Sequence, residues 1–197
     1  MSLIRSCLVI LALSGAFSVH ADPVRVDSGS ALALVVKHFG WLESAGVNVA
    51  WTQPGQPADF FAANGEQALA ARAAGKPLKA IYVLSRSPAG DDAHFLLASE
   101  TLLAQRGPEA RVVLAALERA RNWIVADPAA AEALAGAAVH DRNFSGSRPG
   151  PAQLVSLKKL ARANGLNEQF GAAVLDDSAY RAALTRARSD SLAILSR

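Results

Sequence analysis

The chain has 197 residues, 51% of them hydrophobic and 19% charged, with a formal net charge of +3. This length allows one domain with a buried core. The charge is nearly balanced, so nothing points to a nucleic-acid partner, and the single cysteine excludes a disulfide framework.

Residues 1–21 have the pattern of a cleavable export signal. Arg5 supplies a positive start, Cys7–Val19 is an interrupted apolar run, and Val19-His20-Ala21 has the small-residue spacing of a cleavage site. The alternative is an uncleaved membrane anchor, for which the run is short. We therefore expect a periplasmic protein whose mature part, residues 22–197, lacks cysteine and forms a single α/β domain.

The stretch 24–51 predicts a strand, a polar turn, a helix and a second strand. Val24 and Val26 alternate with polar residues, as in a half-buried strand. Apolar residues then recur at helical spacing from Leu32 to Leu42, and alternation returns from Val47 to Trp51. The mature protein thus opens with a βαβ pattern.

Ser28, Gly29 and Ser30 fall between the first strand and the first helix. Unpaired N–H groups and the positive end of the macrodipole make a helix start suitable for an anion. The alternative is an ordinary β-to-α turn with Ser30 as the N-cap. In both interpretations Gly29 is expected to use its freedom to adopt a positive φ.

The next segments predict one or two helices and two strands. Ala58–Ala74 has helical composition with a break at Asn64-Gly65, and Ala80–Leu84 is a continuous apolar run typical of a buried parallel strand. A further short strand is expected at Ala93–Ala98. Residues 22–90 then form a strand-helix-strand unit.

Residues 91–197 are expected to be mainly helical. Pro108 starts a helix whose buried stripe runs to Ile124, and Asp127-Pro128 starts the next. His140–Pro151 is a loop, and the helix after it is closed by Gly165. The predicted fold class is α/β, with a small mostly parallel sheet flanked by helices and a helix-rich C-terminal half.

The charged residues give no sign of catalysis. Arg86, at a strand end, could pair with a sulfonate or carboxylate or could be an exposed hinge residue, and Arg142 and Arg148 are expected to be solvated. The histidines have no acid at ligand spacing, and the chain has no nucleophile elbow, dinucleotide loop or P-loop. We therefore expect no enzyme activity, no cofactor and no metal.

Four stretches in fixed order resemble the periplasmic solute-binding proteins of ABC importers, in particular the aliphatic sulfonate, taurine and nitrate binders. They cover residues 24 to about 166 and begin with VRVDSGSALALVVKHFGWLESAGVNVAW. The others are FFAANGE with AARAAGKPLKAIYVLSR, the run from His94 to Ala135, and HDRNFSGSRPGPAQLVSLKKLARANGL. The resemblance implies one lobe of a type II binding-protein fold, a small anionic solute and a membrane permease as partners, and ligand contacts from Ser28, Gly29 and Ser30.

The chain departs from this family in length. Its members are two-lobed and close around their ligand, whereas here Ser87-Pro88 is followed almost at once by Asp91-Asp92, with no room for a second lobe. We therefore expect a shortened binding component for a small organic anion. The alternative is a non-binding remnant or interaction module that self-associates through an exposed lobe face.

Overall fold

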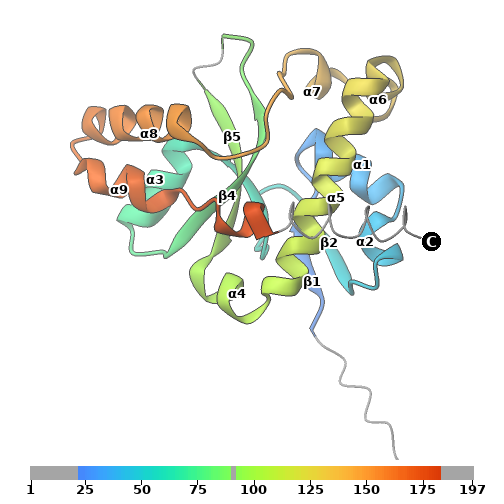
Figure 1. Cartoon of the computed structure of the whole chain (residues 1–197), viewed down its shortest axis with the longest axis horizontal. Coiled ribbons are helices and arrows are strands. Elements are labelled where there is room, and N and C mark those ends of the chain that lie inside the picture. The colour runs from blue at the N-terminus through green and yellow to red at the C-terminus, as the bar shows by residue number, and fades with distance from the viewer. Residues whose placement is uncertain (1–21, 90–91, 183–197) are drawn as a thin grey trace, which may run out of the picture.

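The computed structural model describes residues 22–89 and 92–182 (Figure 1). The predicted export signal lies outside these residues, and within them no helix is long and apolar enough to cross a membrane. The strands are β1 (Val24–Asp27), β2 (Val49–Thr52), β3 (Phe61–Asn64), β4 (Leu78–Arg86) and β5 (Ala93–Ser99). The helices are α1 (Ala31–His38), α2 (Trp41–Ser44), α3 (Gly65–Ala73), α4 (Glu100–Gln105), α5 (Gly107–Ala126), α6 (Pro128–Ala135), α7 (Ala137–His140), α8 (Pro151–Ala163) and α9 (Glu168–Val174).

The strands form two small sheets that are joined at one point. Strands β1 and β2 are parallel, whereas β3, β5 and β4 form an antiparallel sheet in that order. The junction is a parallel bridge between Val26 and Phe60, reinforced by a hydrogen bond from the N–H of Asp27 to the carbonyl of Phe60. The end of β1 therefore lies beside the start of β3.

Helices cover both faces of the three-stranded sheet. On one side lie α1, α2, α5 and α6, and on the other lie α3, α8 and α9 (Figure 1). Each side has its own apolar core: Leu84 and Leu96 belong to the first, and Val83 and Phe95 to the second. The arrangement confirms the predicted α/β class with flanking helices, but the predicted mostly parallel sheet is wrong: among the described strands only β1 and β2 are parallel, and the three-stranded sheet is antiparallel.

Two local predictions are wrong. Residues 61–64 form strand β3 rather than the first part of a helix. Helical propensity is overridden here by burial on both sides of the sheet, since Ala62 packs against the first core and Ala63 against the second. The apolar run 80–84 is buried as expected, but its strand is antiparallel because β4 returns directly as β5.

The remaining helices follow their sequence signals. The first predicted helix is divided at Gly40, whose φ of 60° is left-handed, into α1 and α2. Helix α5 begins with Pro108 in its first turn, and Asp127 caps α6 by accepting the N–H of Ala130 at 3.0 Å. The strand predicted at 93–98 is confirmed as β5, which is the central strand of its sheet.

Candidate functional site

The turn after β1 is tied closely to the protein itself. The backbone N–H and the hydroxyl of Ser28 both donate to the carbonyl of Thr52, at 3.1 and 2.8 Å. Ser30 is the N-cap of α1, since its Oγ accepts the N–H of Ala33 at 3.1 Å. The hydroxyls of Ser28 and Ser30 thus hold the turn and the helix start in place.

Gly29 is required for packing rather than for an unusual backbone angle. Its φ is not positive, contrary to the expectation from the sequence. A β-carbon at this position would lie 2.8 Å from Cγ of Pro54, so no larger residue fits without a shift. Its N–H donates at 2.8 Å to the buried carboxylate of Asp27, whose other oxygen accepts the N–H of Ala62. This amide is therefore already engaged by an acid of the chain.

A cavity of about 160 Å³ lies beside this turn, at the start of α1. Its wall combines the helix start with the ends of β4 and β5 and with the segment after α7. The amide N–H groups of Ala31 and Leu32 are first-turn donors that lack a partner within the helix. The lining residues are Gly29, Ser30, Ala31, Leu32, Ala62, Leu84, Ser85, His94, Arg142 and Phe144.

Two basic side chains that the sequence did not indicate face this cavity. Arg142 is half-buried rather than solvated, because the chain after α7 turns back along the edge of β4. His94 enters from β5, where burial and then the charge of Arg142 lower its pKa, although Asp92 at 4.0 Å acts in the opposite direction. His94 is therefore neutral at neutral pH, and Arg142 supplies the positive charge.

The other two residues proposed from the sequence, Ser28 and Arg86, do not line this cavity. Arg86 ends β4, and its backbone pairs with that of Asn143 at 2.9 Å in both directions. Its Nε is buried without a hydrogen-bond partner in the described part of the chain, and its guanidinium lies against Gly146. The structure thus brings Gly29 and Ser30 together with Arg142, but not with Arg86.

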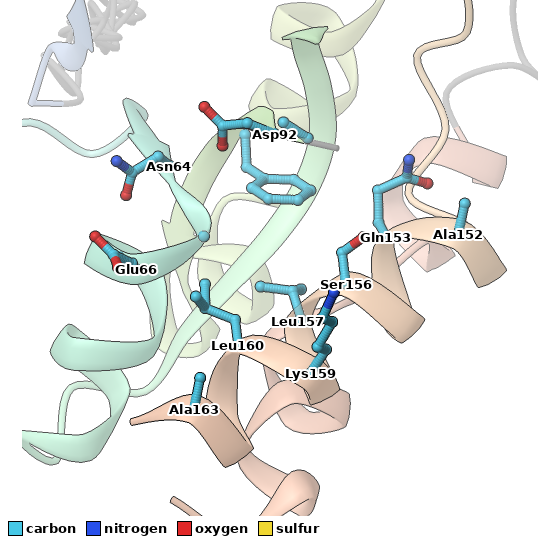
Figure 2. A pocket seen from close by; sticks show the side chains of 13 residues that line it. Asn64, Glu66, Asp92, Ala152, Gln153, Ser156, Leu157, Lys159, Leu160 and Ala163 are labelled. Carbon is cyan, nitrogen blue, oxygen red and sulfur yellow. The ribbon is translucent and has the colours of Figure 1, made fainter. Parts of the chain in front are cut away.

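A second, larger cavity of about 500 Å³ lies on the other side of the sheet, between α3 and α8 (Figure 2). Its lining includes the apolar residues Phe95, Leu157 and Leu160 and the charged residues Glu66, Asp92 and Lys159. Phe95 and Leu157 are only 2% exposed, whereas Leu160 is half-buried. No group of three or more His, Cys, Asp or Glu side chains in the described ranges could hold a metal ion.

No protein-family model and no curated protein matches the chain. Two solved structures are similar to it. A protein from Bordetella bronchiseptica RB50 matches with a TM-score of 0.64 and 11% identity, over 85% of this chain and 98% of that one. The alkanesulfonate-binding protein SsuA from Xanthomonas axonopodis pv. citri, bound to MOPS, matches with a TM-score of 0.60 and 14% identity, over 80% of this chain and 99% of that one. At these identities the likeness shows the fold alone, which this chain shares with both structures.

Proposed function

We propose that this protein is a periplasmic substrate-binding component that takes up a small organic anion, with an aliphatic sulfonate such as taurine as the first candidate. It would present the anion to the membrane permease of an ABC importer and would have no enzymatic activity. The ligand class is supported by the fold shared with a sulfonate-binding protein whose structure contains MOPS, itself a sulfonate. The export signal expected in residues 1–21 supports the location outside the cytoplasm.

One observation carries this proposal: the cavity at the start of α1 joins helix N–H groups to an arginine. An anionic oxygen there accepts from the first-turn amides of Ala31 and Leu32, where the helix dipole is positive. Arg142 adds a charge-assisted hydrogen bond from the opposite wall. Both contributions select for negative charge and for a headgroup small enough for about 160 Å³.

The remaining lining residues set the character of the ligand. Leu32, Leu84 and Phe144 belong to the wall but are buried, at 0%, 2% and 8% exposed, so the apolar part of the site suits a short aliphatic chain at most. Ser85 is a buried hydroxyl, 9% exposed, that can donate to a further ligand oxygen. The carboxylate of Asp27 does not oppose the anion directly, because it is engaged with the N–H groups of Gly29 and Ala62 and does not line the cavity.

The proposal includes the loss of a second lobe. Strands β4 and β5 follow each other as an antiparallel pair, and the N–H of Ser87 donates to the carbonyl of Asp92 across their connection at 2.8 Å. This closed hairpin supports a binding component reduced to one lobe. A ligand held by one lobe keeps part of its surface in water, so we expect weaker binding than in an enclosed site.

Isothermal titration calorimetry with the purified protein tests the function. Taurine, ethanesulfonate and nitrate are titrated at pH 6 and pH 8, with ethanolamine as the matched ligand that lacks an anionic head. We expect saturable heat with at least one sulfonate and none with ethanolamine. Absence of heat with all three anions would reject this function and favour the non-binding alternative, which light scattering would then examine as self-association.

A further inference from the structure

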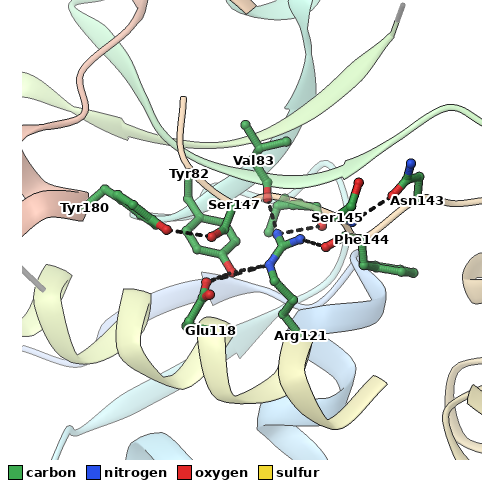
Figure 3. Close-up of polar contacts among 10 residues, drawn as sticks. Tyr82, Val83, Glu118, Arg121, Asn143, Phe144, Ser145, Ser147 and Tyr180 are labelled. Carbon is green, nitrogen blue, oxygen red and sulfur yellow. Dashed lines mark hydrogen bonds and ion pairs between the residues drawn. The ribbon is translucent and has the colours of Figure 1, made fainter. Parts of the chain in front are cut away.

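A buried arginine, which does not line the cavity at the start of α1, donates hydrogen bonds to residues of the cavity wall. Arg121, on α5, is 4% exposed, and its guanidinium lies between β4 and the segment after α7 (Figure 3). It donates to the carbonyls of Phe144 and Val83, and at 3.5 Å to that of Leu84. Two of these three carbonyls, those of Leu84 and Phe144, belong to residues that form the cavity wall.

The pairing of β4 with β5 is irregular next to this arginine. The pairing of β4 with β5 shifts register between Val83 and Ser85, as in a β-bulge. A bulge interrupts the ladder and re-aims the neighbouring side chain, and here Ser85 lines the cavity. Buried carbonyls without partners are costly, and Arg121 provides donors for those of Val83 and Leu84.

The arginine is itself held by two residues. Its Nε donates to the hydroxyl of Tyr82 at 3.0 Å, and that hydroxyl donates to Glu118 at 2.8 Å. Glu118 also lies 3.7 Å from Nε of Arg121, so its charge compensates the buried guanidinium. Burial, the dominant cause, raises the pKa of Tyr82, so the hydroxyl keeps its proton and serves as donor and acceptor together.

The bond from Arg121 is one of several contacts that hold the segment that carries Arg142. Its later part is held by Ser147, whose carbonyl accepts from Val83 at 2.8 Å and whose hydroxyl bonds to Tyr180. Nearer to Arg142, its own N–H donates to the carbonyl of Val139 at 3.4 Å, and Asn143 pairs with β4 through its backbone. Phe144 is buried in the first core, and Arg121 donates to its carbonyl. That bond lies two residues from Arg142.

From this geometry we infer that Arg121 is a positioning residue for the anion site: it fixes the bulge that presents Ser85 and the segment that presents Arg142. The inference rests on the function proposed above. Arg121 touches no ligand and acts through backbone carbonyls. Replacing Arg121 should therefore displace Arg142, although none of the residues that line the cavity is itself changed.

The pKa of His94 depends on how close Arg142 lies, so measuring it detects a displacement of Arg142 in the absence of a ligand. Burial lowers the pKa of His94 most, the charge of Arg142 lowers it further, and the charge of Asp92 raises it. NMR titration of His94 in Arg142→Met gives the value with the charge of Arg142 removed. We expect Arg121→Met to raise the pKa of His94 toward this value, and Arg119→Met, which removes an exposed arginine from the same helix, to leave it unchanged.

The anion affinity is the second readout. We expect Arg121→Met to raise the Kd for the sulfonate at least tenfold, whereas Leu157→Ala, which weakens the core on the other face, leaves it unchanged. Because Arg121→Met could fail to fold, Tyr82→Phe provides a milder variant that removes the acceptor of Nε and keeps the ring. Tyr82→Phe should raise both the pKa of His94 and the Kd for the sulfonate, each by less than Arg121→Met does.

A folded Arg121→Met, or Tyr82→Phe if the former does not fold, with the wild-type pKa of His94 would overturn the positioning role. If the wild-type protein binds no anion while the pKa of His94 still rises in these variants, the positioning role stands and the proposed function fails. The two conclusions are therefore separable by experiment.

Discussion

The two faces of the β3-β5-β4 sheet differ in what they bury. The face under α3, α8 and α9 is packed with apolar side chains such as Leu69, Phe95 and Leu157, and ion pairs lie at its exposed margin, as between Arg162 and Glu168. The face under α5 lies against buried polar groups. Among the described residues, five of the six buried polar side chains lie in β1, the turn after it, β4, α5 and the segment after α7: Asp27, Ser28, Ser85, Arg121 and Ser147.

This difference suggests that one face of the sheet mainly stabilises the fold and that the other holds the proposed binding site. Burying a polar group costs free energy unless it is fully hydrogen-bonded, so a purely apolar face is the cheaper way to stabilise a fold. Only Ser85 of these five side chains lines the cavity, whereas Asp27, Ser28 and Arg121 hydrogen-bond to the turn and strands beside it. We therefore expect these groups to hold the walls of the proposed site rather than to add stability alone. Substitutions on the α8 face should change stability alone, and those around the cavity should change anion affinity more than stability.

The largest effect is expected on the apolar face. Leu157 is 2% exposed in the core beneath α8, and replacing it by Ala removes buried methyl groups and leaves a cavity. Such substitutions lower the free energy of unfolding by about 2–5 kcal/mol. Urea denaturation measures the loss, and calorimetry of the folded variant should give the wild-type Kd. A changed Kd would mean that the two faces are coupled.

The next effect is expected at the cavity. Arg142→Met removes the positive charge that faces the ligand, and hydrogen bonds to charged groups are worth about 1.5–3 kcal/mol, so the Kd should rise at least tenfold. Arg148→Met is the matched control, since Arg148 is exposed and paired with Asp177 away from the cavity. Equal Kd values for the two variants would contradict the role of Arg142.

A smaller effect is expected at the start of α1. Ser30→Ala removes the N-cap of the helix, which costs about 1 kcal/mol of stability and loosens the amides that face the anion. Ser44→Ala, which removes an exposed hydroxyl that donates to the carbonyl of Gly40, serves as the control. Thermal unfolding and calorimetry should show a lower Tm and a weaker affinity for Ser30→Ala alone.

The smallest effect is a dependence on pH. Because the pKa of His94 is lowered in the folded state, the unfolded chain binds the proton more readily below about pH 6.5. The contribution of His94 to stability is therefore complete above that pH and declines as the pH falls toward the folded pKa. A bound anion favours the protonated imidazole, so affinity should increase over the same range. His94→Gln should lose both trends in urea denaturation and calorimetry at pH 5 to 8.

The sequence predicted the elements that depend on local signals. The N-cap at Ser30, the proline in the first turn of α5 and the cap at Asp127 were all readable, and each begins the helix that was expected. Strand β3 was missed because its alanines favour a helix, although residues 60–63 alternate between the two sides of the sheet. Strand direction was missed because a buried apolar run does not specify its partner.

The candidate site was only partly predictable. Gly29 and Ser30 could be proposed because they follow a strand and precede a helix within a few residues. His94 and Arg142 are 64 and 112 positions beyond Ser30, and no local pattern connects them with it. They reach the cavity through the central position of β5 and the backbone pairing of Asn143 with Arg86. That tertiary pairing leaves no periodic signal in a single sequence.

Chemical-shift mapping of the protein with ethanesulfonate tests the central claim most directly. If the anion binds at the start of α1, the amide signals of Ala31 and Leu32 and the side-chain Nε–H signal of Arg142 should move together and saturate at one Kd, while those of Leu157 and its neighbours on α8 stay in place. Saturating shifts confined to α8 or to Arg86, or no saturating shift at all, would contradict the account.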